Sequence, residues 1–420
     1  MSVQLEKAIL VSVSLPNRPW HGEDPCEEIR GLAETAHAQI VGEVTQRRHD
    51  IETATYVGKG KLEAIHELAE TTDADVVIFD NDLSPGQARN LEKLLKIKVI
   101  DRTELILDIF ATRARSPESR LQVELAQLEY SLPRLKQMWS HLSRQKGGGI
   151  GLRGPGETQL EVDRRLVSGR IRDLKAKLTI IQSRKEREVS ARYEEHTVCL
   201  VGYTNAGKSR LMKSLTHADI FVQDQLFSTL DTRTRQWHIK EWGKILLSDT
   251  VGFIRDLPHH LVASFKATLE EARQARLLLH IVDASSPHVE AHIQSVQSVL
   301  TELECDQKPS LLVLNKCDKI MDRERLNLLL AVHPKAVAIS AATGEGFEAL
   351  RQAVIASLTS DYIDALITAR TSNGKLQAYL DAHATIIDKS YQEDQVMIRC
   401  SLPRYLLHHV SGEDVIIKET

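Results

Sequence analysis

The chain has 420 residues, 42% of them hydrophobic and 27% charged, and its formal net charge at pH 7 is −4. This is the composition of ordinary globular protein, long enough for about three domains. No run of 18 apolar residues occurs, and residues 1–7 lack the apolar stretch of a signal peptide. We therefore expect a cytoplasmic protein without a transmembrane segment, with peripheral membrane association left open. The five cysteines form no Cys-x-x-Cys pair, which argues against a zinc site or a disulfide framework.

Residues 1–115 predict a small N-terminal α/β domain. Apolar runs typical of strands cover 8–13, 75–79 and 98–100, and helical patterns cover 26–38, 60–69, 85–95 and 104–111. Strands that alternate with helices in this way favour a largely parallel sheet. The turn Gly58-Lys59-Gly60-Lys61 begins one of these helices and could hold an anion such as a nucleotide phosphate. An ordinary glycine-lysine turn has the same sequence, so both interpretations stay open.

Residues 116–195 predict a helical hairpin. Apolar residues recur every three or four positions from Leu121 to Leu142, and again from Val167 to Ile181. Two heptad-like seams separated by a short loop are typical of two antiparallel helices in a coiled coil. Pro133 interrupts the first seam, so we expect a kink there or a break into two helices. Two amphipathic helices packed on the neighbouring domains would have the same periodicity, and this alternative stays open.

The loop of this hairpin, residues 147–157, is rich in glycine. Six of its eleven residues are glycine, and the segment 134–192 carries 15 Lys and Arg against 6 Asp and Glu. The local net charge is thus +9 in a chain of net charge −4, which leaves −13 for the rest. A charge run is usually a solvated face. A projecting basic arm with a tip of small residues is better explained by a polyanionic partner, and RNA is the obvious one.

Residues 196–360 contain the sequence boxes of a nucleotide-binding domain. Residues 202–209 fit the phosphate-loop pattern Gly-x-x-x-x-Gly-Lys-Ser, between a strand-like and a helix-like run. In this pattern backbone N–H groups surround the phosphates, Lys208 reaches the β- and γ-phosphates, and the Ser209 hydroxyl ligates Mg²⁺. We expect a phosphate-loop domain built on a Rossmann-like mixed sheet.

Asp318 selects the base in this interpretation. Its box, Asn315-Lys316-Cys317-Asp318, follows the apolar run 311–314. A carboxylate can accept two hydrogen bonds from N1–H and the exocyclic amine of guanine, whereas adenine would present an acceptor to it. A buried carboxylate left without its donors costs about 1–3 kcal/mol or more. The sequence therefore predicts GTP rather than ATP, with Asn315 and Lys316 bracing the base and the phosphate loop.

The box 249–252, Asp-Thr-Val-Gly, supplies an acid for Mg²⁺ and a glycine N–H for the γ-phosphate. Phe253 follows it, where GTPases that orient the attacking water with a side chain usually have Gln, and Phe neither donates nor accepts a hydrogen bond. We therefore expect the isolated chain to hydrolyse GTP at about 10⁻³ s⁻¹ or slower, and a partner to stimulate it. Thr229, in the segment 227–231, is the expected second Mg²⁺-ligating hydroxyl, with Thr232 and Thr234 as rivals.

Residues 361–420 predict a small C-terminal α/β domain without assigned chemistry. A helical pattern covers 376–383, and strand-like runs cover 384–387, 395–400 and 414–418. The fold class expected for the whole chain is therefore α/β, with an N-terminal α/β domain, a helical arm, a GTP-binding domain and this appendage.

The chain resembles the HflX family of ribosome-associated translational GTPases, in the TRAFAC class. The resemblance rests on the turn 55–61, the glycine-rich stretch 149–165, the phosphate loop and the extended box 249–258. It covers essentially residues 1–360 and continues more weakly to the end. Two residues depart from the family pattern, because Arg210 and Thr232 stand where the family usually has Thr and Pro.

The resemblance implies binding of GTP or GDP with Mg²⁺, held by Ser209 and Thr229, and catalytic roles for Lys208, Thr229 and Gly252. It leaves open weak ATP binding by the N-terminal domain, which some members are reported to use. By similarity, the nucleotide-binding residues are Gly202, Tyr203, Thr204, Asn205, Ala206, Gly207, Lys208, Ser209, Phe227, Ser228, Thr229, Leu230, Asp231, Asp249, Thr250, Val251, Gly252, Asn315, Lys316, Cys317, Asp318, Ser340, Ala341 and Ala342.

The resemblance also implies a function on the ribosome. Such a GTPase would bind the large (50S-type) subunit and its RNA, with the arm reaching toward the peptidyl-transferase region. It would dissociate stalled or stressed ribosomes, and the ribosome would stimulate its GTP hydrolysis. We expect a monomer. The alternative is a GTP-controlled adaptor that binds a protein complex or a membrane surface through the arm. The basic charge of the arm and its glycine tip favour the ribosome.

Overall fold

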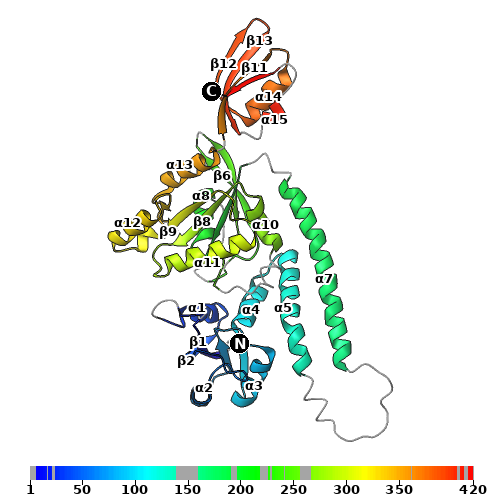
Figure 1. The fold of residues 1–420 in the computed structure, drawn as a ribbon, viewed down its shortest axis with the longest axis vertical. Helices are drawn as coiled ribbons and strands as arrows, with labels where there is room; N and C mark the ends of the chain where they lie inside the picture. The colour runs from blue at the N-terminus through cyan, green and yellow to red at the C-terminus, as the bar shows by residue number, and fades with distance from the viewer. Residues whose placement is uncertain are drawn as a thin grey trace.

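The computed structural model describes residues 6–16, 18–20, 24–138, 159–190, 196–217, 226–227, 229–240, 242–255, 266–360, 362–403, 407–410 and 415–419. Three sheets follow one another along the long axis of the molecule, and a pair of long helices runs beside the first two (Figure 1). Within the described residues, no helix is both long enough and apolar enough to cross a bilayer. The α/β fold class is confirmed.

The N-terminal sheet has four parallel strands in the order β2-β1-β3-β4. Its strands are β1 (Lys7–Ser14), β2 (Gln39–Arg47), β3 (Val76–Phe79) and β4 (Lys98–Asp101), and its helices are α1 (Glu27–Thr35), α2 (Lys59–Thr72), α3 (Pro85–Leu95) and α4 (Arg102–Arg113). Strand β1 is buried on both faces, as its continuous apolar run predicts for a parallel sheet. Strand β2 was not predicted, because this edge strand mixes polar and apolar residues.

Two long helices form the arm: α5 (Pro117–Met138) and α7 (Gln159–Ser190). They pair through side-chain ion pairs, with Arg170 Nε 2.7 Å from Glu124 Oε1 and Lys175 Nζ 2.7 Å from Glu129 Oε1. Helix α5 also packs on α3 and α4, so the hairpin and the packing on a neighbouring domain occur together. Of the kink or break expected at Pro133, the break into two helices is absent, since α5 continues through it. Trp139, Leu142 and the loop 147–157 lie outside the described residues.

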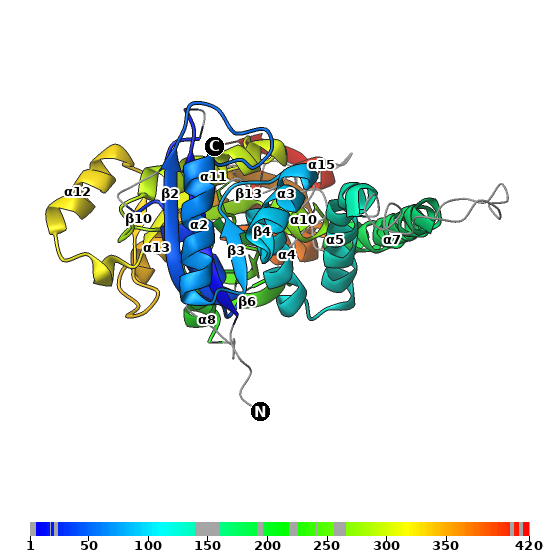
Figure 2. The same cartoon turned by 90° about the horizontal axis from the view of Figure 1, so that it is seen from below.

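Seen along the long axis, α7 projects to one side of the molecule, away from α12 on the opposite side (Figure 2). The central sheet lies between them. It has six strands in the order β10-β9-β8-β5-β7-β6, and only β6 runs antiparallel to its neighbour. This is the expected mixed sheet. Its elements are β5 (Thr197–Gly202), α8 (Lys208–Thr216), β6 (Arg233–Ile239), β7 (Gly243–Asp249), α10 (Lys266–Gln274), β8 (Leu277–Asp283), α11 (Val289–Glu302), β9 (Ser310–Asn315), the 3₁₀ helix η1 (Cys317–Lys319), α12 (Arg323–Val332), β10 (Val337–Ala338) and α13 (Phe347–Leu358).

The C-terminal sheet has four antiparallel strands in the order β12-β13-β11-β14, beside two helices. Its elements are β11 (Tyr362–Arg370), α14 (Gly374–His383), β12 (Thr385–Gln392), β13 (Gln395–Pro403), α15 (Leu407–Val410) and β14 (Ile416–Glu419). Strand β11 was not predicted, although it is the inner strand that pairs with both β13 and β14. From these limits we propose domains at 1–115, 116–195, 196–360 and 361–420.

A buried ion cluster joins the N-terminal domain to the phosphate loop. The Arg102 side chain, 1% exposed, donates to the Glu28 carboxylate and, over 2.7 Å, to Asp80. It also donates to the backbone carbonyl of Arg255 over 3.0 Å. The Glu28 carboxylate accepts from the Tyr203 hydroxyl over 2.7 Å. Burial raises the pKa of Glu28, but the nearby Arg102 and Arg255 outweigh it and hold that pKa below its ordinary value.

Replacing Arg102 should destabilise the protein strongly. Arg102→Ala would remove the buried cation that pairs most closely with Glu28 and Asp80 and would leave only the more distant Arg255 beside them. Removing one partner of a buried ion pair costs about 3–5 kcal/mol. The matched control is Arg30→Ala, because Arg30 pairs with Asp24 and Glu43 while about a third exposed. Such a surface pair contributes about 1 kcal/mol or less. Urea unfolding of both variants checks the prediction, and equal losses of stability would contradict it.

Candidate functional site

The turn between β5 and α8 places the phosphate-loop residues at the carboxyl end of a central strand, where open α/β sheets bind ligands. Gly207 has a φ of +94°, and a Cβ there would lie 2.3 Å from Nδ2 of Asn315. Only glycine fits this position, because the backbone is left-handed and the neighbouring amide leaves no room. The Asn315 amide fills that space and donates to the Ala206 carbonyl over 2.8 Å.

Lys208 is buried at the start of α8. Its Nζ donates to the backbone carbonyls of Gly202 and Tyr203, each over 2.9 Å. Burial lowers the pKa of Lys208 to about 8. A Cβ added to Gly252 would lie 3.0 Å from Lys208 Nζ and 2.7 Å from the Thr204 Cα. Lys208 and Gly252, two of the three predicted catalytic residues, therefore face each other across a space that a side chain would fill.

Two hydroxyls and one carboxylate meet beside Lys208. Ser209 Oγ lies 2.7 Å from Thr229 Oγ1 and donates to Asp249 Oδ2 over 2.6 Å. The other oxygen of Asp249 is buried and has no hydrogen-bond partner within the described residues. Burial raises the pKa of Asp249, although Lys208 opposes this shift. An orphaned carboxylate oxygen beside two hydroxyls fits a hard divalent cation such as Mg²⁺, and the described contacts single out Thr229 among the three candidate threonines.

The opposite end of the cavity holds the Asp318 carboxylate. The Ser340 hydroxyl donates to Asp318 Oδ1 over 2.6 Å and fixes its direction. Asn315 Oδ1 accepts from the Ala341 N–H over 2.9 Å, and Lys316 Nζ lies 2.8 Å from Asp283. The box 315–318 is thus held to the segment 340–342 on one side and to the phosphate loop on the other.

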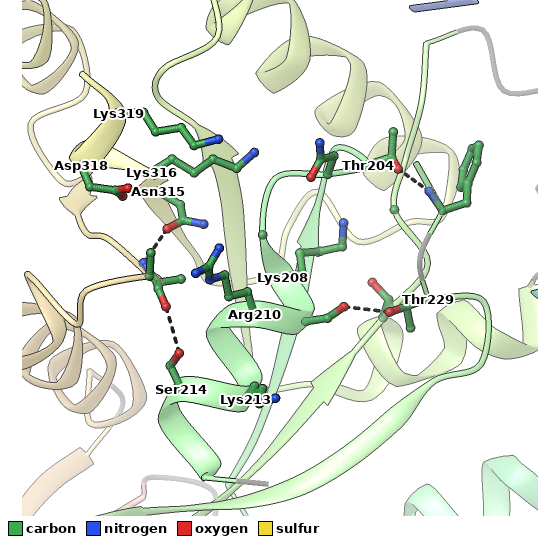
Figure 3. A pocket seen from close by; sticks show the side chains of 18 of the residues that line it. Thr204, Lys208, Arg210, Lys213, Ser214, Thr229, Asn315, Lys316, Asp318 and Lys319 are labelled. Atoms are coloured by element: carbon green, nitrogen blue, oxygen red, sulfur yellow. Dashed lines mark hydrogen bonds between the residues drawn. The ribbon is translucent and has the colours of Figure 1, made fainter. Parts of the chain in front are cut away.

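These residues surround one cavity of about 730 Å³, within the roughly 300–1,000 Å³ of small-molecule sites. Figure 3 shows Lys208 and Thr229 on one side of it and Asn315 and Asp318 on the other. Predicted residues that line it are Thr204, Asn205, Gly207, Lys208, Ser209, Phe227, Thr229, Thr250, Gly252, Asn315, Lys316, Asp318, Ala341 and Ala342. Predicted residues outside this lining are Gly202, Tyr203, Ala206, Leu230, Asp231, Asp249, Val251, Cys317 and Ser340. Ser228 lies outside the described residues.

The cavity also has cations that the sequence boxes do not include. Arg210, Lys213 and Lys319 contribute to its lining, together with Ser214 and His217. Arg210 projects from the first turn of α8 into the cavity (Figure 3). With Lys208 and Lys316, five cations line the cavity, and Asp318 is the only carboxylate among its described lining residues. This excess of positive charge suits a polyphosphate ligand. The departure of Arg210 from the family pattern was the signal that could have identified it.

The Phe253 side chain lies outside the lining of the cavity. Its side chain is 2% exposed and belongs to an apolar cluster with Phe110 of α4 and Phe227. Its backbone pairs with the phosphate loop, since Thr204 N–H donates to the Phe253 carbonyl over 2.7 Å and Phe253 N–H donates to the Gly202 carbonyl over 3.1 Å. Phe253 therefore anchors the segment after Gly252 and orients no water.

The turn 58–61 lies away from this cavity. Gly58 precedes α2, and its N–H donates to the Gln46 side chain of β2 over 3.3 Å. A separate cavity of about 440 Å³ lies near the end of β1, lined by residues that include Trp20, Arg47 and Arg48. No residue of the turn contributes to the lining of either cavity.

Family comparisons agree with this geometry. Residues 23–111 match the family "GTP-binding GTPase N-terminal", residues 113–192 match "GTP-binding GTPase Middle Region", and residues 197–316 match "50S ribosome-binding GTPase". The chain is 48% identical over 343 residues to the GTPase HflX of Alkalihalophilus pseudofirmus, covering 81% of this chain and 80% of that protein. It is 44% identical over 392 residues to the GTPase HflX of Escherichia coli, covering 93% and 91%.

Among solved structures, a GTP-binding protein from Sulfolobus solfataricus in complex with GDP is 26% identical, with a TM-score of 0.44. The match covers 85% of this chain and 99% of that one. The fold, the phosphate loop and the family matches define a phosphate-loop GTPase, an enzyme that binds and hydrolyses GTP. The chain belongs to the HflX family of GTPases.

The first test of the site concerns the base. Asp318→Asn should lose most of its GTP affinity and gain affinity for XTP, because the new amide nitrogen can donate to the 2-oxo group of xanthine but cannot accept from the exocyclic amine of guanine. Titration with both nucleotides measures the change. Unchanged affinities for GTP and XTP would remove Asp318 from the site.

A second test concerns Arg210. Arg210→Thr, which restores the usual family residue, should weaken GDP and GTP binding about threefold to tenfold, while guanosine binding stays the same, because a partly exposed charge on a phosphate contributes about 1 kcal/mol. Lys213→Thr, one turn further along α8, is the comparison and should change binding less than twofold. Equal effects on guanosine and GDP would show that Arg210 does not act on phosphate.

Proposed function

We propose that this chain binds the large ribosomal subunit through its arm and uses GTP to separate stalled or stressed ribosomes. The matched family "50S ribosome-binding GTPase" supports the choice of partner. In this proposal the chain works as a monomer in the cytoplasm. Ser209 and Thr229 hold Mg²⁺, Lys208 and Gly252 contact the γ-phosphate, and Asp318 recognises guanine.

The observation that carries the proposal is the division of the cations on α7. Arg170 and Lys175 are neutralised by Glu124 and Glu129 of α5. Three further cations of the helix, Arg164, Arg172 and Lys177, are exposed and form no ion pair with the described residues of α5. Because the rest of the chain is acidic, exposed cations on a projecting element favour a polyanion such as ribosomal RNA.

One feature of α7 favours the adaptor alternative. Leu166 and Ile180 are 66% and 71% exposed on the same helix. Exposed apolar side chains at this spacing suit a protein partner better than RNA. The adaptor would use the same GTP cycle but would not bind ribosomal RNA. Raising the salt concentration and reversing the charge of exposed cations on α7 should therefore weaken partner binding only if the partner is the ribosome.

The proposal predicts that purified large subunits accelerate a slow intrinsic reaction. The isolated chain should turn over GTP at about 10⁻³ s⁻¹ or slower, because Phe253 is buried and cannot position water. The double variant Arg172→Glu, Lys177→Glu should sediment with large subunits at least tenfold more weakly in the presence of a non-hydrolysable GTP analogue. Lys335→Glu, an exposed cation of the central domain, is the control and should bind like the wild type.

Fast hydrolysis by the isolated chain, with no increase on adding large subunits, would contradict the proposal. Unchanged subunit binding by the double variant would assign the arm to a scaffold and favour the adaptor. In the ribosome case, binding should also weaken steeply as salt rises, because each neutralised phosphate releases counterions.

A further inference from the structure

Asp231 lies two residues beyond Thr229, yet its carboxylate turns away from the cavity and toward the arm. Its Oδ1 accepts from the Ser116 hydroxyl over 2.6 Å. Its Oδ2 accepts from the backbone N–H groups of Ser116, over 3.2 Å, and Arg115, over 3.3 Å. These three donors come from the residues that directly precede α5. Asp231 therefore binds the base of the arm rather than lining the cavity.

Ser116 is itself the cap of α5. Its hydroxyl accepts from the Ser119 N–H over 3.0 Å, and Pro117 occupies the first helical position. This is the usual arrangement for a helix start, with a hydroxyl on an N–H of the first turn and a proline where no N–H is needed. The Ser116 hydroxyl thus accepts from the helix and donates to Asp231. A carboxylate at this end of a helix is also favoured by the helix dipole.

The chain just before Asp231 reaches Ser209, one of the residues proposed to hold Mg²⁺. Thr229 Oγ1 is 2.7 Å from Ser209 Oγ, and Leu230, 2% exposed, fills the position between Thr229 and Asp231. Two consecutive residues of an extended chain span at most about 7 Å. The anchored Asp231 and the buried Leu230 therefore leave Thr229 little freedom to move unless the base of α5 moves with it.

Two further contacts hold this segment against helices outside the central sheet. The Phe227 ring packs edge-on against Phe110 of α4, with ring centroids 4.7 Å apart. Lys185 of α7 donates to the Thr232 hydroxyl over 3.3 Å. Both helices of the arm, and the last helix of the N-terminal domain, thus contact residues on either side of Thr229.

We propose that Asp231 is a positioning residue that ties Thr229 to the arm through Ser116, so that GTP binding and arm orientation control each other. The proposal rests on the nucleotide and Mg²⁺ assignments of the proposed function and names their regulation. By thermodynamic linkage, a partner that holds the arm in this orientation raises the affinity for GTP with Mg²⁺ by the factor by which GTP raises the affinity for that partner. The affinity for GDP, which has no γ-phosphate beside Thr229, rises less.

The test uses the full chain without ribosomal subunits. Asp231→Ala should weaken binding of a non-hydrolysable GTP analogue with Mg²⁺ about tenfold, while GDP affinity changes less than about twofold. Ser116→Ala should have a smaller effect in the same direction, because it removes the hydroxyl donor and keeps the two backbone N–H donors to Asp231. The double variant should lose little more than Asp231→Ala alone, because Asp231→Ala already removes the whole link. A purely structural cap would lower stability without changing the ratio of the two affinities.

The matched control is Glu124→Gln, which breaks the ion pair with Arg170 further along the arm. Its ratio of GTP-analogue to GDP affinity should equal that of the wild type. The proposal is overturned if folded Asp231→Ala and Ser116→Ala keep the wild-type ratio, or if Glu124→Gln changes the ratio as much as they do. Since no subunit is present, this result is independent of whether the ribosome is the partner, which subunit-stimulated hydrolysis by the wild type decides separately.

Discussion

The Arg102 guanidinium, enclosed between the carboxylates of Glu28 and Asp80, decides how the N-terminal domain meets the nucleotide cavity. Removing one partner of a buried charge of this kind is strongly destabilising, because it leaves the other charge buried without compensation. Its partners extend to Tyr203 in the phosphate loop and Arg255 beyond the box 249–252. The N-terminal domain is therefore joined to the part of the cavity where the γ-phosphate of GTP is proposed to lie.

The second contact of this kind is the one between Asp231 and Ser116. The two cavity segments expected to respond to the γ-phosphate are thus held from outside the central sheet, one by the N-terminal domain and one by the arm. The Phe253 side chain also points away from the cavity, since it packs in the apolar cluster with Phe110 of α4 and Phe227. This arrangement suits an enzyme whose hydrolysis depends on what its other domains contact, which agrees with the slow reaction predicted for the isolated chain.

The sequence predicted most of the cavity because its boxes are short, contiguous and chemically constrained. Gly207 and Asn315 show why, since one needs a left-handed backbone and the other fills the space beside it. The links between domains could not be predicted in the same way. Arg102 and Arg255 are 153 residues apart, and Ser116 and Asp231 are 115 apart, so no local pattern indicates either contact. Asp231 was assigned to the nucleotide by family resemblance, and its contact with Ser116 was not predicted. Strands β2 and β11 were missed because polar residues interrupt their apolar pattern.

The central claim is that the occupant of the cavity controls the base of the arm. Hydrogen exchange of the backbone amides at 115–120, in the full chain with Mg²⁺, tests it most directly, because the capped first turn of α5 opens more easily when its cap is lost. The account predicts slower exchange of these amides with a non-hydrolysable GTP analogue than with GDP, and no such difference along 170–180 of α7. Equal exchange at 115–120 with the two nucleotides, both bound to saturation, would contradict the account.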